Sequence, residues 1–298
     1  MHKTAIIIEG PTAVGKTAIS IRVAHPLRTE IVSADSRQCY AEMSIGTAKP
    51  SADELRQVKH HFIGEFPVTH QLTAADYERL ALGYLDNIFI HHDTAIVCGG
   101  TGLYINALCN GLDEMPQVDA TIAAAINDTY SKEGLAWLQN AVQTEDAAFY
   151  ATGEIHNPSR LLRALSFIRS TGRSITEYRT STRKGRPFRI IKIGLELPRE
   201  ILYERINKRV DVMMQEGLLE EVRSLLPYRD LKNLQTVGYS ELFDHLEGNC
   251  TLAEATDKIK QHTRNYAKRQ MTWFKKDKDI VWLPADDPTV AQQIAALV

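Results

Sequence analysis

The 298 residues of this chain are enough for a large hydrophobic core and a second, smaller lobe. Its 44% hydrophobic and 24% charged residues are ordinary for a globular protein, and a formal net charge of −2 means that a polyanion could bind only at a local basic patch. The four cysteines form no C-x-x-C pair, which argues against a zinc site or a disulfide framework and favours a reducing compartment.

The N-terminal segment leads directly into an apolar run, Ala5–Ile8, which predicts a buried strand with no signal peptide before it. No apolar run in the chain approaches the ~20 residues that span a bilayer. We therefore expect a cytoplasmic protein that makes no contact with a membrane.

The next residues, GPTAVGKT, match the phosphate-binding loop pattern G-x-x-x-x-G-K-[ST] at every fixed position, and a helix is predicted directly after them. In such a loop, backbone N–H groups surround a diphosphate or triphosphate, the lysine reaches the terminal phosphates, and the last hydroxyl ligates Mg2+. The expected phosphate ligands are Gly10, Pro11, Thr12, Ala13, Val14, Gly15, Lys16 and Thr17. Thr17 is also the expected Mg2+ ligand.

Two further strands are predicted in the first third of the chain, at Glu30–Ser33 and Thr94–Cys98. Polar or glycine-rich residues follow them at Ser33–Arg37 and Gly99–Gly102. Because ligands gather at the carboxyl ends of parallel strands, we expect these segments and the phosphate loop to form one site. The alternation of strands and helices predicts an α/β fold with a parallel sheet of the phosphate-loop type.

Asp35 and Thr101 are the candidate reactive side chains at these strand ends. Asp35 could act as a general base or orient a nucleophile, although capping a turn is an equally common role for aspartate. Thr101 could donate a hydrogen bond to a phosphate or bridging oxygen, or cap the helix that follows. The adjacent His60 and His61 are expected to be structural, because neighbouring side chains on a helix do not face one another.

From residue 111 to residue 189 the strand signals vanish, and helices are predicted at 120–130, 134–141 and 159–170. The apolar run Ile190–Leu195 predicts a strand that returns to the sheet. We therefore expect a core of residues 1–110 and 190–298 with a helical insertion at 111–189. Further helices are predicted in the core at 199–216, 218–226, 239–246 and 252–275.

Basic residues concentrate in three places. Arg205 and Arg209 are four apart on one predicted helix face, which suits pairing with nearby acidic residues as well as a diphosphate clamp, and we expect both to bind the diphosphate. The segment Lys258–Lys278 interleaves eight lysines and arginines with aromatic residues, a pattern typical of a nucleic-acid surface and also of a solvated helix. A second basic run at Arg160–Arg189 favours a nucleic-acid surface made of two parts.

Five blocks together resemble the tRNA dimethylallyltransferase family, also called tRNA isopentenyltransferase, in its smaller bacterial form. In the family's order they are GPTAVGKT, SADSRQCY with IGTAKP, CGGTGLYI, NPSRLLRAL, and TVGYSEL with AKRQMTWF. Many enzymes share a phosphate loop, but this set in this order is highly specific and spans nearly the whole chain.

The resemblance implies transfer of a dimethylallyl group from dimethylallyl diphosphate to N6 of adenosine 37, next to the tRNA anticodon, with release of diphosphate. The phosphate loop would hold this diphosphate with Mg2+ and would not hold ATP. Asp35 would be the general base, and Thr101 would hold the bridging oxygen of the donor. The expected tRNA contacts are Asp35, Ser36, Arg37, Gln38, Thr101, Ser159, Arg160, Arg163, Gly238, Tyr239, Lys268, Arg269, Gln270 and Trp273. The insertion would bind tRNA, and we expect a monomer.

The sequence departs from the family pattern at two positions. Ala123 stands where family members usually carry arginine, so one tRNA contact is lost or supplied by another residue. Cys39 replaces an aliphatic residue, which is a tolerated core change. The chain also shows no C-terminal zinc-finger extension of the kind that eukaryotic relatives have.

Three other functions stay open on the residues alone. A small-molecule kinase would bind ATP tightly in the loop. An adenylate isopentenyltransferase would prenylate free AMP, ADP or ATP and would not need the basic C-terminal segment. A non-catalytic RNA-binding protein that uses nucleoside triphosphates would give Asp35 no chemical task.

Overall fold

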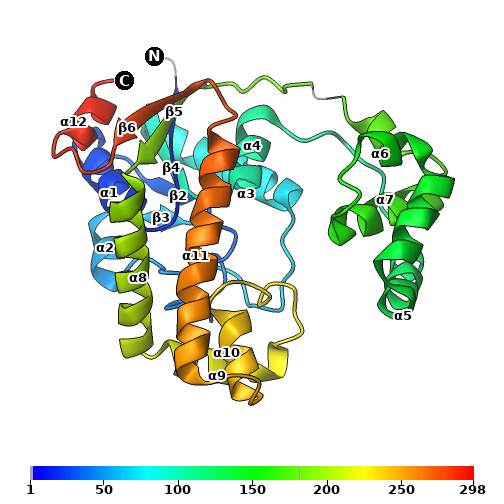
Figure 1. Cartoon of the computed structure of the whole chain (residues 1–298). Helices are drawn as coiled ribbons and strands as arrows, with labels where there is room; N and C mark the ends of the chain where they lie inside the picture. Colours follow the sequence, from blue (N-terminus) through cyan, green and yellow to red (C-terminus); the bar gives the residue numbers. More distant parts are fainter. Residues whose placement is uncertain (1–2, 181) are drawn as a thin grey trace. The chain divides into compact units, whose positions relative to one another are not determined.

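The computed structural model describes residues 3–180 and 182–298. These residues contain a six-stranded parallel sheet (Figure 1). Its strand order is β3-β2-β4-β1-β5-β6. The strands are β1 (Thr4–Glu9), β2 (Ile31–Ser33), β3 (His60–His61), β4 (Thr94–Gly99), β5 (Arg189–Glu196) and β6 (Ile280–Pro284). The predicted α/β fold with a parallel sheet is confirmed, whereas β3 and β6, at the two edges of the sheet, were not predicted.

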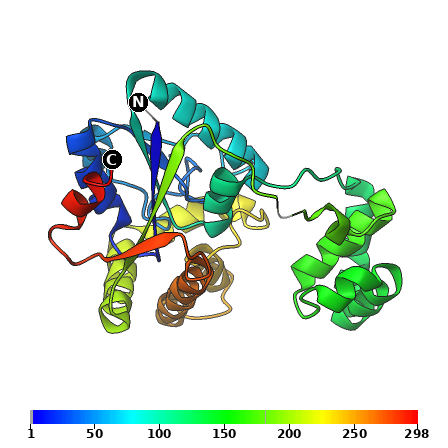
Figure 2. The same cartoon turned by 90° about the horizontal axis from the view of Figure 1, so that it is seen from above.

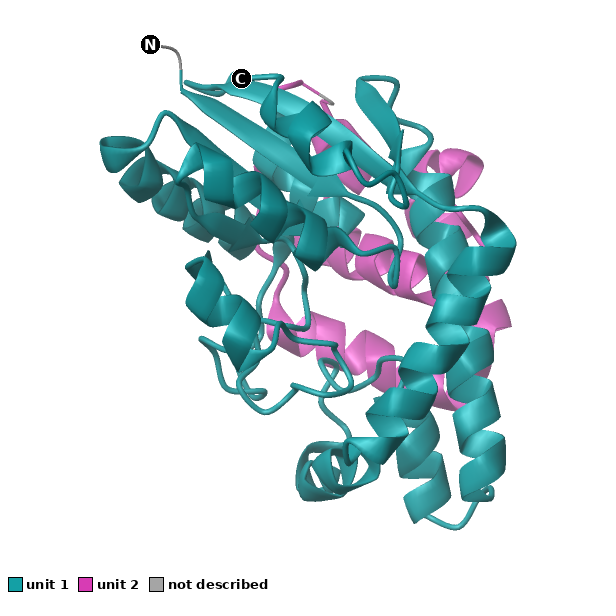
Figure 3. Cartoon of the chain, turned by 90° about the vertical axis from the view of Figure 1, so that its left-hand side faces the viewer, with its two compact units in different colours: residues 1–110, 185–298 teal, residues 111–184 magenta. Residues whose placement is uncertain are grey.

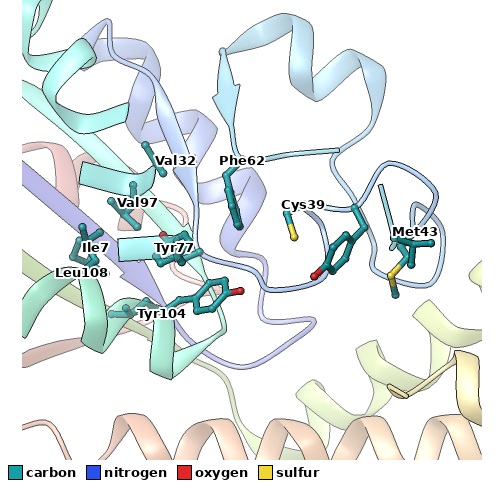
Figure 4. Close-up of a cluster of buried hydrophobic side chains, with 14 of the residues drawn as sticks. Ile7, Val32, Cys39, Met43, Phe62, Tyr77, Val97, Tyr104 and Leu108 are labelled. Atoms are coloured by element: carbon teal, nitrogen blue, oxygen red, sulfur yellow. The ribbon is translucent and has the colours of Figure 1, made fainter. Parts of the chain in front are cut away.

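Helices cover both faces of this sheet, which explains why its central strands are apolar along their whole length. On one face, α3 (Ala74–His91) and α4 (Gly102–Asn110) pack against the strands. Figure 4 shows Ile7, Val32 and Val97 of three strands near Tyr77 of α3 and Tyr104 of α4. On the other face lie α1 (Lys16–Leu27), α8 (Arg199–Gln215) and α12 (Val290–Ala295).

The remaining helices of this part are α2 (Ala52–Gln57), α9 (Leu218–Ser224), α10 (Tyr239–Leu246) and α11 (Leu252–Phe274), with a 3-10 turn at Leu226–Tyr228. The long helices α8 and α11 lie side by side in both views (Figures 1 and 2). The bounds of α8, α10 and α11 agree with the predicted helices to within a residue. Helix α3 was not predicted, although a capping box of Thr73 and Asp76 marks its start.

The described chain divides into two units, which Figure 3 distinguishes by colour. The first consists of residues up to 110 together with 185–298, and the second of residues 111–184. The second unit ends before residue 189 because Arg186 is anchored in the first. Its guanidinium donates to the carbonyl oxygens of Leu108 at 2.7 Å and Ala107 at 2.8 Å, and it pairs with Glu78 at 2.7 Å.

The second unit is helical and has its own core. It contains α5 (Ala120–Glu145), α6 (Ala147–Thr152), α7 (Pro158–Thr171) and a 3-10 turn at Ile175–Tyr178. Its core is formed by Ile126, Leu138, Val142, Phe149, Leu161, Ala164, Leu165, Phe167 and Ile175. Gly134 interrupts α5 with a φ of 77°, which explains why two separate helices were predicted there.

The assumption that His60 and His61 lie on a helix was wrong, because they form strand β3. His60 Nδ1 lies 2.8 Å from the carbonyl oxygen of Val58, and His61 Nε2 lies 2.6 Å from Glu30 Oε2. Among the residues that the structure describes, no group of three or more His, Cys, Asp or Glu side chains could hold a metal ion. In the same part of the chain, no helix is long and apolar enough to cross a membrane.

One carboxyl group is buried in the sheet itself. Glu9, the last residue of β1, is 2% exposed, and its Oε1 has no hydrogen-bond partner within the described residues. Burial raises the pKa of Glu9 to about 8, although Lys192, which pairs with Asp277 at 2.7 Å, acts in the opposite direction. Near neutral pH, Glu9 is therefore largely protonated in the folded protein.

We expect Glu9→Gln to stabilise the protein by an amount that grows with pH. The folded state keeps the Glu9 proton up to about pH 8, whereas an unfolded chain releases it near pH 4.5, so wild-type stability falls as pH rises through this window. The amide cannot ionise, and its advantage should grow by about 1–3 kcal/mol across the window. Urea unfolding at several pH values measures this difference.

Glu204→Gln is the matched control, because Glu204 is an exposed carboxylate on α8. Its effect on the free energy of unfolding should not depend on pH over the same range. An equally flat profile for Glu9→Gln would mean that Glu9 ionises at its ordinary pKa in the folded protein.

Candidate active site

The phosphate loop turns from β1 into α1 through backbone conformations that favour glycine. Gly10 and Gly15 have φ values of 152° and 105°, and Ala13 also has a positive φ of 65°. A Cβ on Gly10 would lie only 2.7 Å from the backbone oxygen of Leu195. Helix α1 starts at Lys16 with no side-chain cap, so its first N–H groups and its partial positive charge are available to an anion at the loop.

Lys16 is folded back onto this loop. Its Nζ donates to the carbonyl oxygens of Gly10 at 3.0 Å and Pro11 at 2.8 Å. Burial of the ammonium group lowers the pKa of Lys16 to about 8, with Cys98 and Asp35 acting against the shift and Arg209 adding to it. An anion bound in the loop could take the place of the two carbonyl oxygens and would favour the charged form of Lys16.

Helix α8 brings two more cations to the loop. Arg205 Nη1 lies 3.4 Å from the carbonyl oxygen of Val14. Arg209 has no hydrogen bond or ion pair within the described part of the chain, and burial lowers the pKa of its guanidinium. Both arginines therefore lie beside the phosphate loop, where residues expected to bind a diphosphate would have to be. A partly buried guanidinium without a protein partner is favoured when an anion binds beside it.

Asp35 and Thr101 lie at neighbouring strand ends and are tied into the same turn. Asp35 Oδ1 accepts hydrogen bonds from the backbone N–H groups of Arg37 at 2.8 Å and Gln38 at 3.2 Å. Thr101 Oγ1 accepts from the backbone N–H of Ser36 at 3.0 Å. Asp35 therefore organises its turn through one oxygen, while its side chain also lines the cavity next to the phosphate loop.

The cavity has two lobes that share Thr12, Asp35, Arg209 and Tyr266. The phosphate lobe is polar, and its other lining residues include Lys16, Thr17, Glu54 and Gln270. The apolar lobe is lined by Val210, Met213, Leu218, Val237 and Ile259 together with the polar residues around Asp35. The arrangement thus joins a cationic, phosphate-sized site to an apolar site, with a carboxylate where they meet.

Tyr266 is a site residue that sequence reasoning missed. It lines both lobes, and although the residue is 36% exposed, desolvation of its hydroxyl in the cavity raises its pKa to about 12, with Asp35 as the next cause. The sequence gave one usable signal, since Tyr266 lies one helical turn before Gln270 on α11 and so shares its face. It was noted only as one aromatic residue of the basic segment.

The expected tRNA contacts of the first unit fall into exposed and buried groups. Lys268, Arg269 and Trp273 are exposed on α11, whereas Gln270 of the same helix is buried. Tyr239 is also buried, and its hydroxyl donates to Glu221 Oε1 at 2.6 Å. The other expected tRNA contacts of this unit line the cavity or belong to the hydrogen-bonded turn around Asp35: Asp35, Ser36, Arg37, Gln38, Thr101 and Gly238.

The other expected tRNA contacts belong to the second unit. Ser159, Arg160 and Arg163 are exposed near the start of α7, and Arg160 pairs with Glu154 at 2.7 Å. Ala123 lies in the first turn of α5, where its N–H donates to the carbonyl oxygen of Asp119 at 3.0 Å.

Comparisons with known proteins agree on one family. A family model described as IPP transferase matches residues 38–277. The chain is 48% identical to "tRNA dimethylallyltransferase 1" of Phocaeicola vulgatus, over 98% of each chain. It is similar in structure to the full-length tRNA isopentenylpyrophosphate transferase of Bacillus halodurans, with a TM-score of 0.72 and 35% identity over 100% of this chain and 94% of that one. The structure of a eukaryotic dimethylallyltransferase acting on tRNA is also similar, with a TM-score of 0.79 over 99% of this chain and 77% of that one. Because the two sequences are only 24% identical, this match supports the fold alone.

Proposed function

This chain belongs to the IPP transferase family, and we propose that it is a tRNA dimethylallyltransferase that modifies N6 of adenosine 37. The observation that carries the proposal is the cavity, in which a cationic phosphate lobe meets an apolar lobe at Asp35. An allyl diphosphate has the matching chemistry, because its charged end and its five-carbon end need different surroundings.

In this proposal the donor occupies both lobes. Its diphosphate lies against the loop backbone from Gly10 to Thr17, where Lys16, Arg205 and Arg209 neutralise its charge. Its dimethylallyl group lies in the apolar lobe, where burial is favourable by about 25 cal/mol for each Å² of apolar surface. The lobe would also keep water away from the reacting carbon.

The reaction forms a bond between N6 of adenine and C1 of the dimethylallyl group, and it breaks the bond between C1 and the bridging oxygen. Asp35 accepts the proton that N6 loses, because an aryl amine is a weak nucleophile. Thr101 donates a hydrogen bond to the bridging oxygen as negative charge develops there. The adenine must leave its stack to reach the cavity, since its N6 is enclosed by neighbouring bases in an ordered loop.

The phosphate lobe fits Mg2+. The hydroxyl of Thr17 has no hydrogen-bond partner within the described residues, and the carboxylates of Asp35 and Glu54 line the same lobe. Mg2+ in proteins takes one or two protein oxygens and completes its shell with phosphates and water. Thr17 would hold the metal, and the chemistry supplied by Mg2+ would be neutralisation of the diphosphate charge.

We also propose that the protein acts as a monomer. A tRNA substrate also implies that the protein works in the cytoplasm. The exposed basic residues of α11 and α7, on the two units, are the proposed tRNA-binding surfaces.

Incubation with labelled dimethylallyl diphosphate and unmodified tRNA, followed by digestion to nucleosides, tests the proposal. We expect label in the adenosine next to the anticodon, as N6-isopentenyladenosine. Label in free AMP, ADP or ATP would favour an adenylate isopentenyltransferase. Transfer of the γ-phosphate of ATP to a small acceptor would favour a kinase.

We expect reversal of Lys268 and Arg269 to glutamate to raise the KM for tRNA by about 10- to 100-fold and to flatten its salt dependence. Each cation that contacts a phosphate releases a counterion, and the variant has fewer of these contacts. The KM for dimethylallyl diphosphate should barely change, because both side chains are exposed on α11. Measurement of tRNA affinity at several salt concentrations gives the slope.

Arg22→Glu is the matched control, because Arg22 is an exposed cation on α1. It should leave the affinity for tRNA and the salt slope close to those of the wild type. An unchanged slope in the double variant would mean that this part of α11 is only a solvated helix, and the tRNA surface would then have to lie in the second unit.

A further inference from the structure

Gln270 is the one expected tRNA contact on α11 whose side chain is buried, among the described residues of that helix. It is 6% exposed, while Lys268 and Arg269 beside it are exposed. Its Oε1 accepts a hydrogen bond from the backbone N–H of Thr12 at 2.9 Å, and its Nε2 donates to the backbone oxygen of Gly100 at 2.8 Å. Both ends of one amide are thus occupied by backbone groups.

The two backbone groups belong to the segments that would hold the two parts of the donor. Thr12 lies in the phosphate loop after β1, and Gly100 directly precedes Thr101 after β4. These strands are neighbours in the sheet, with Glu9 opposite Gly99. The amide of Gln270 therefore bridges the diphosphate cradle to the residue proposed for the bridging oxygen.

The packing of α11 on the second segment is close enough to depend on glycine. A Cβ on Gly100 would lie 2.4 Å from Gln270 Nε2, and a Cβ on Gly102 would lie 2.3 Å from Trp273 Cδ1. Real Cβ atoms do not approach other atoms so closely, so glycines on either side of Thr101 let α11 lie directly on this backbone. The helix thereby fixes where Thr101 stands relative to the loop.

We propose that Gln270 is a positioning residue for the transfer reaction, which sets the spacing between the phosphate loop and Thr101 and does not contact tRNA. This inference rests on the proposed function. It replaces the role that the family resemblance implied for Gln270, while Lys268, Arg269 and Trp273 keep theirs.

The pattern of one acceptor and one donor makes a sharp test possible. In Gln270→Glu, an ionised carboxylate can still accept from Thr12 but would face the oxygen of Gly100 with no proton between them. A protonated carboxyl restores the pattern, because its carbonyl accepts and its hydroxyl donates. Burial beside a carbonyl oxygen favours this neutral form. Gln270→Met, similar in length but without either hydrogen bond, is the matched control.

The experiment measures kcat and KM for both substrates, and binding of inorganic diphosphate, between about pH 6 and pH 8. At the upper end we expect Gln270→Glu to lower kcat/KM for dimethylallyl diphosphate by about 10- to 100-fold relative to wild type, with the KM for tRNA changed less than about threefold. Near pH 6, this loss of kcat/KM relative to wild type should be smaller by at least about fivefold. Gln270→Met should show a deficit that does not depend on pH.

A deficit of Gln270→Glu that stays constant with pH, or a change mainly in the KM for tRNA, would overturn the inference. If Gln270→Met does not fold, the pH dependence of Gln270→Glu alone decides. Binding of inorganic diphosphate separates the two proposals, because it requires no reaction with tRNA. One combination of results would support the positioning role and reject the proposed function. In it, Gln270→Glu regains binding of inorganic diphosphate at low pH, while the wild-type protein does not prenylate tRNA.

Discussion

Replacing Asp35 by asparagine is expected to lower turnover by about two to four orders of magnitude in a protein that stays folded. The amide keeps an oxygen that can accept the N–H groups of Arg37 and Gln38, so the turn after β2 should survive. What it loses is the ability to take a proton from N6. Single-turnover measurements with saturating donor and tRNA isolate this loss from changes in binding.

Asp35→Ala serves as the comparison, because it removes both the base and the acceptor of the two backbone hydrogen bonds. We expect it to be at least as slow as Asp35→Asn and also less stable, by about 1–2 kcal/mol for the lost turn cap. Near-normal turnover in a folded Asp35→Asn would leave Asp35 with the capping role alone. The proton would then have to go to another acceptor.

Lys16→Ala is expected to weaken productive binding of dimethylallyl diphosphate by about a hundred- to a thousandfold. The change removes charge-assisted hydrogen bonds to the diphosphate, which contribute about 1.5–3 kcal/mol each. Lys16 also donates hydrogen bonds to the carbonyl oxygens of Gly10 and Pro11, so the variant loses contacts that organise the loop. Kinetics at varied donor concentration, with fixed tRNA, measure the effect.

The pKa of Lys16 adds a pH signature to this prediction. Burial places that pKa at about 8, and only the ammonium form can neutralise a diphosphate. Because kcat/KM reports ionisations of the free enzyme, its value for the donor should fall as pH rises through about 8. Lys16→Arg keeps its charge in this range and should lack the fall. Retained donor affinity in Lys16→Ala, or tight ATP binding with transfer of the γ-phosphate, would contradict the proposed function.

The phosphate loop and the main strands could be predicted from the sequence because their determinants are local. Gly10 and Gly15 carry conformations with positive φ, and the order of strand, loop and helix is written within Thr4–Leu27. Central parallel strands are buried on both faces and so appear as continuous apolar runs. The edge strands β3 and β6 lack this pattern. His60–His61 is too short and too polar to be recognised as a strand without its partner β2.

The rest of the site could be found only in the tertiary structure. Helical periodicity placed Arg205 and Arg209 on one face, but the packing of α8 decides that this face meets the phosphate loop. The same periodicity on α11 groups Tyr266 with Gln270. It cannot tell that both line the cavity or that only Gln270 bridges the backbone of Thr12 and Gly100.

The sequence by itself identified the family and predicted the phosphate site and the candidate base, because each of these signals is carried by short motifs whose residues are close together in the chain. The tertiary structure decided which distant side chains join them, how Gln270 is used, and that Glu9 keeps its proton. Those outcomes depend on burial and on contacts between segments more than a hundred residues apart, and a one-dimensional pattern carries no information about the solvent that packing excludes.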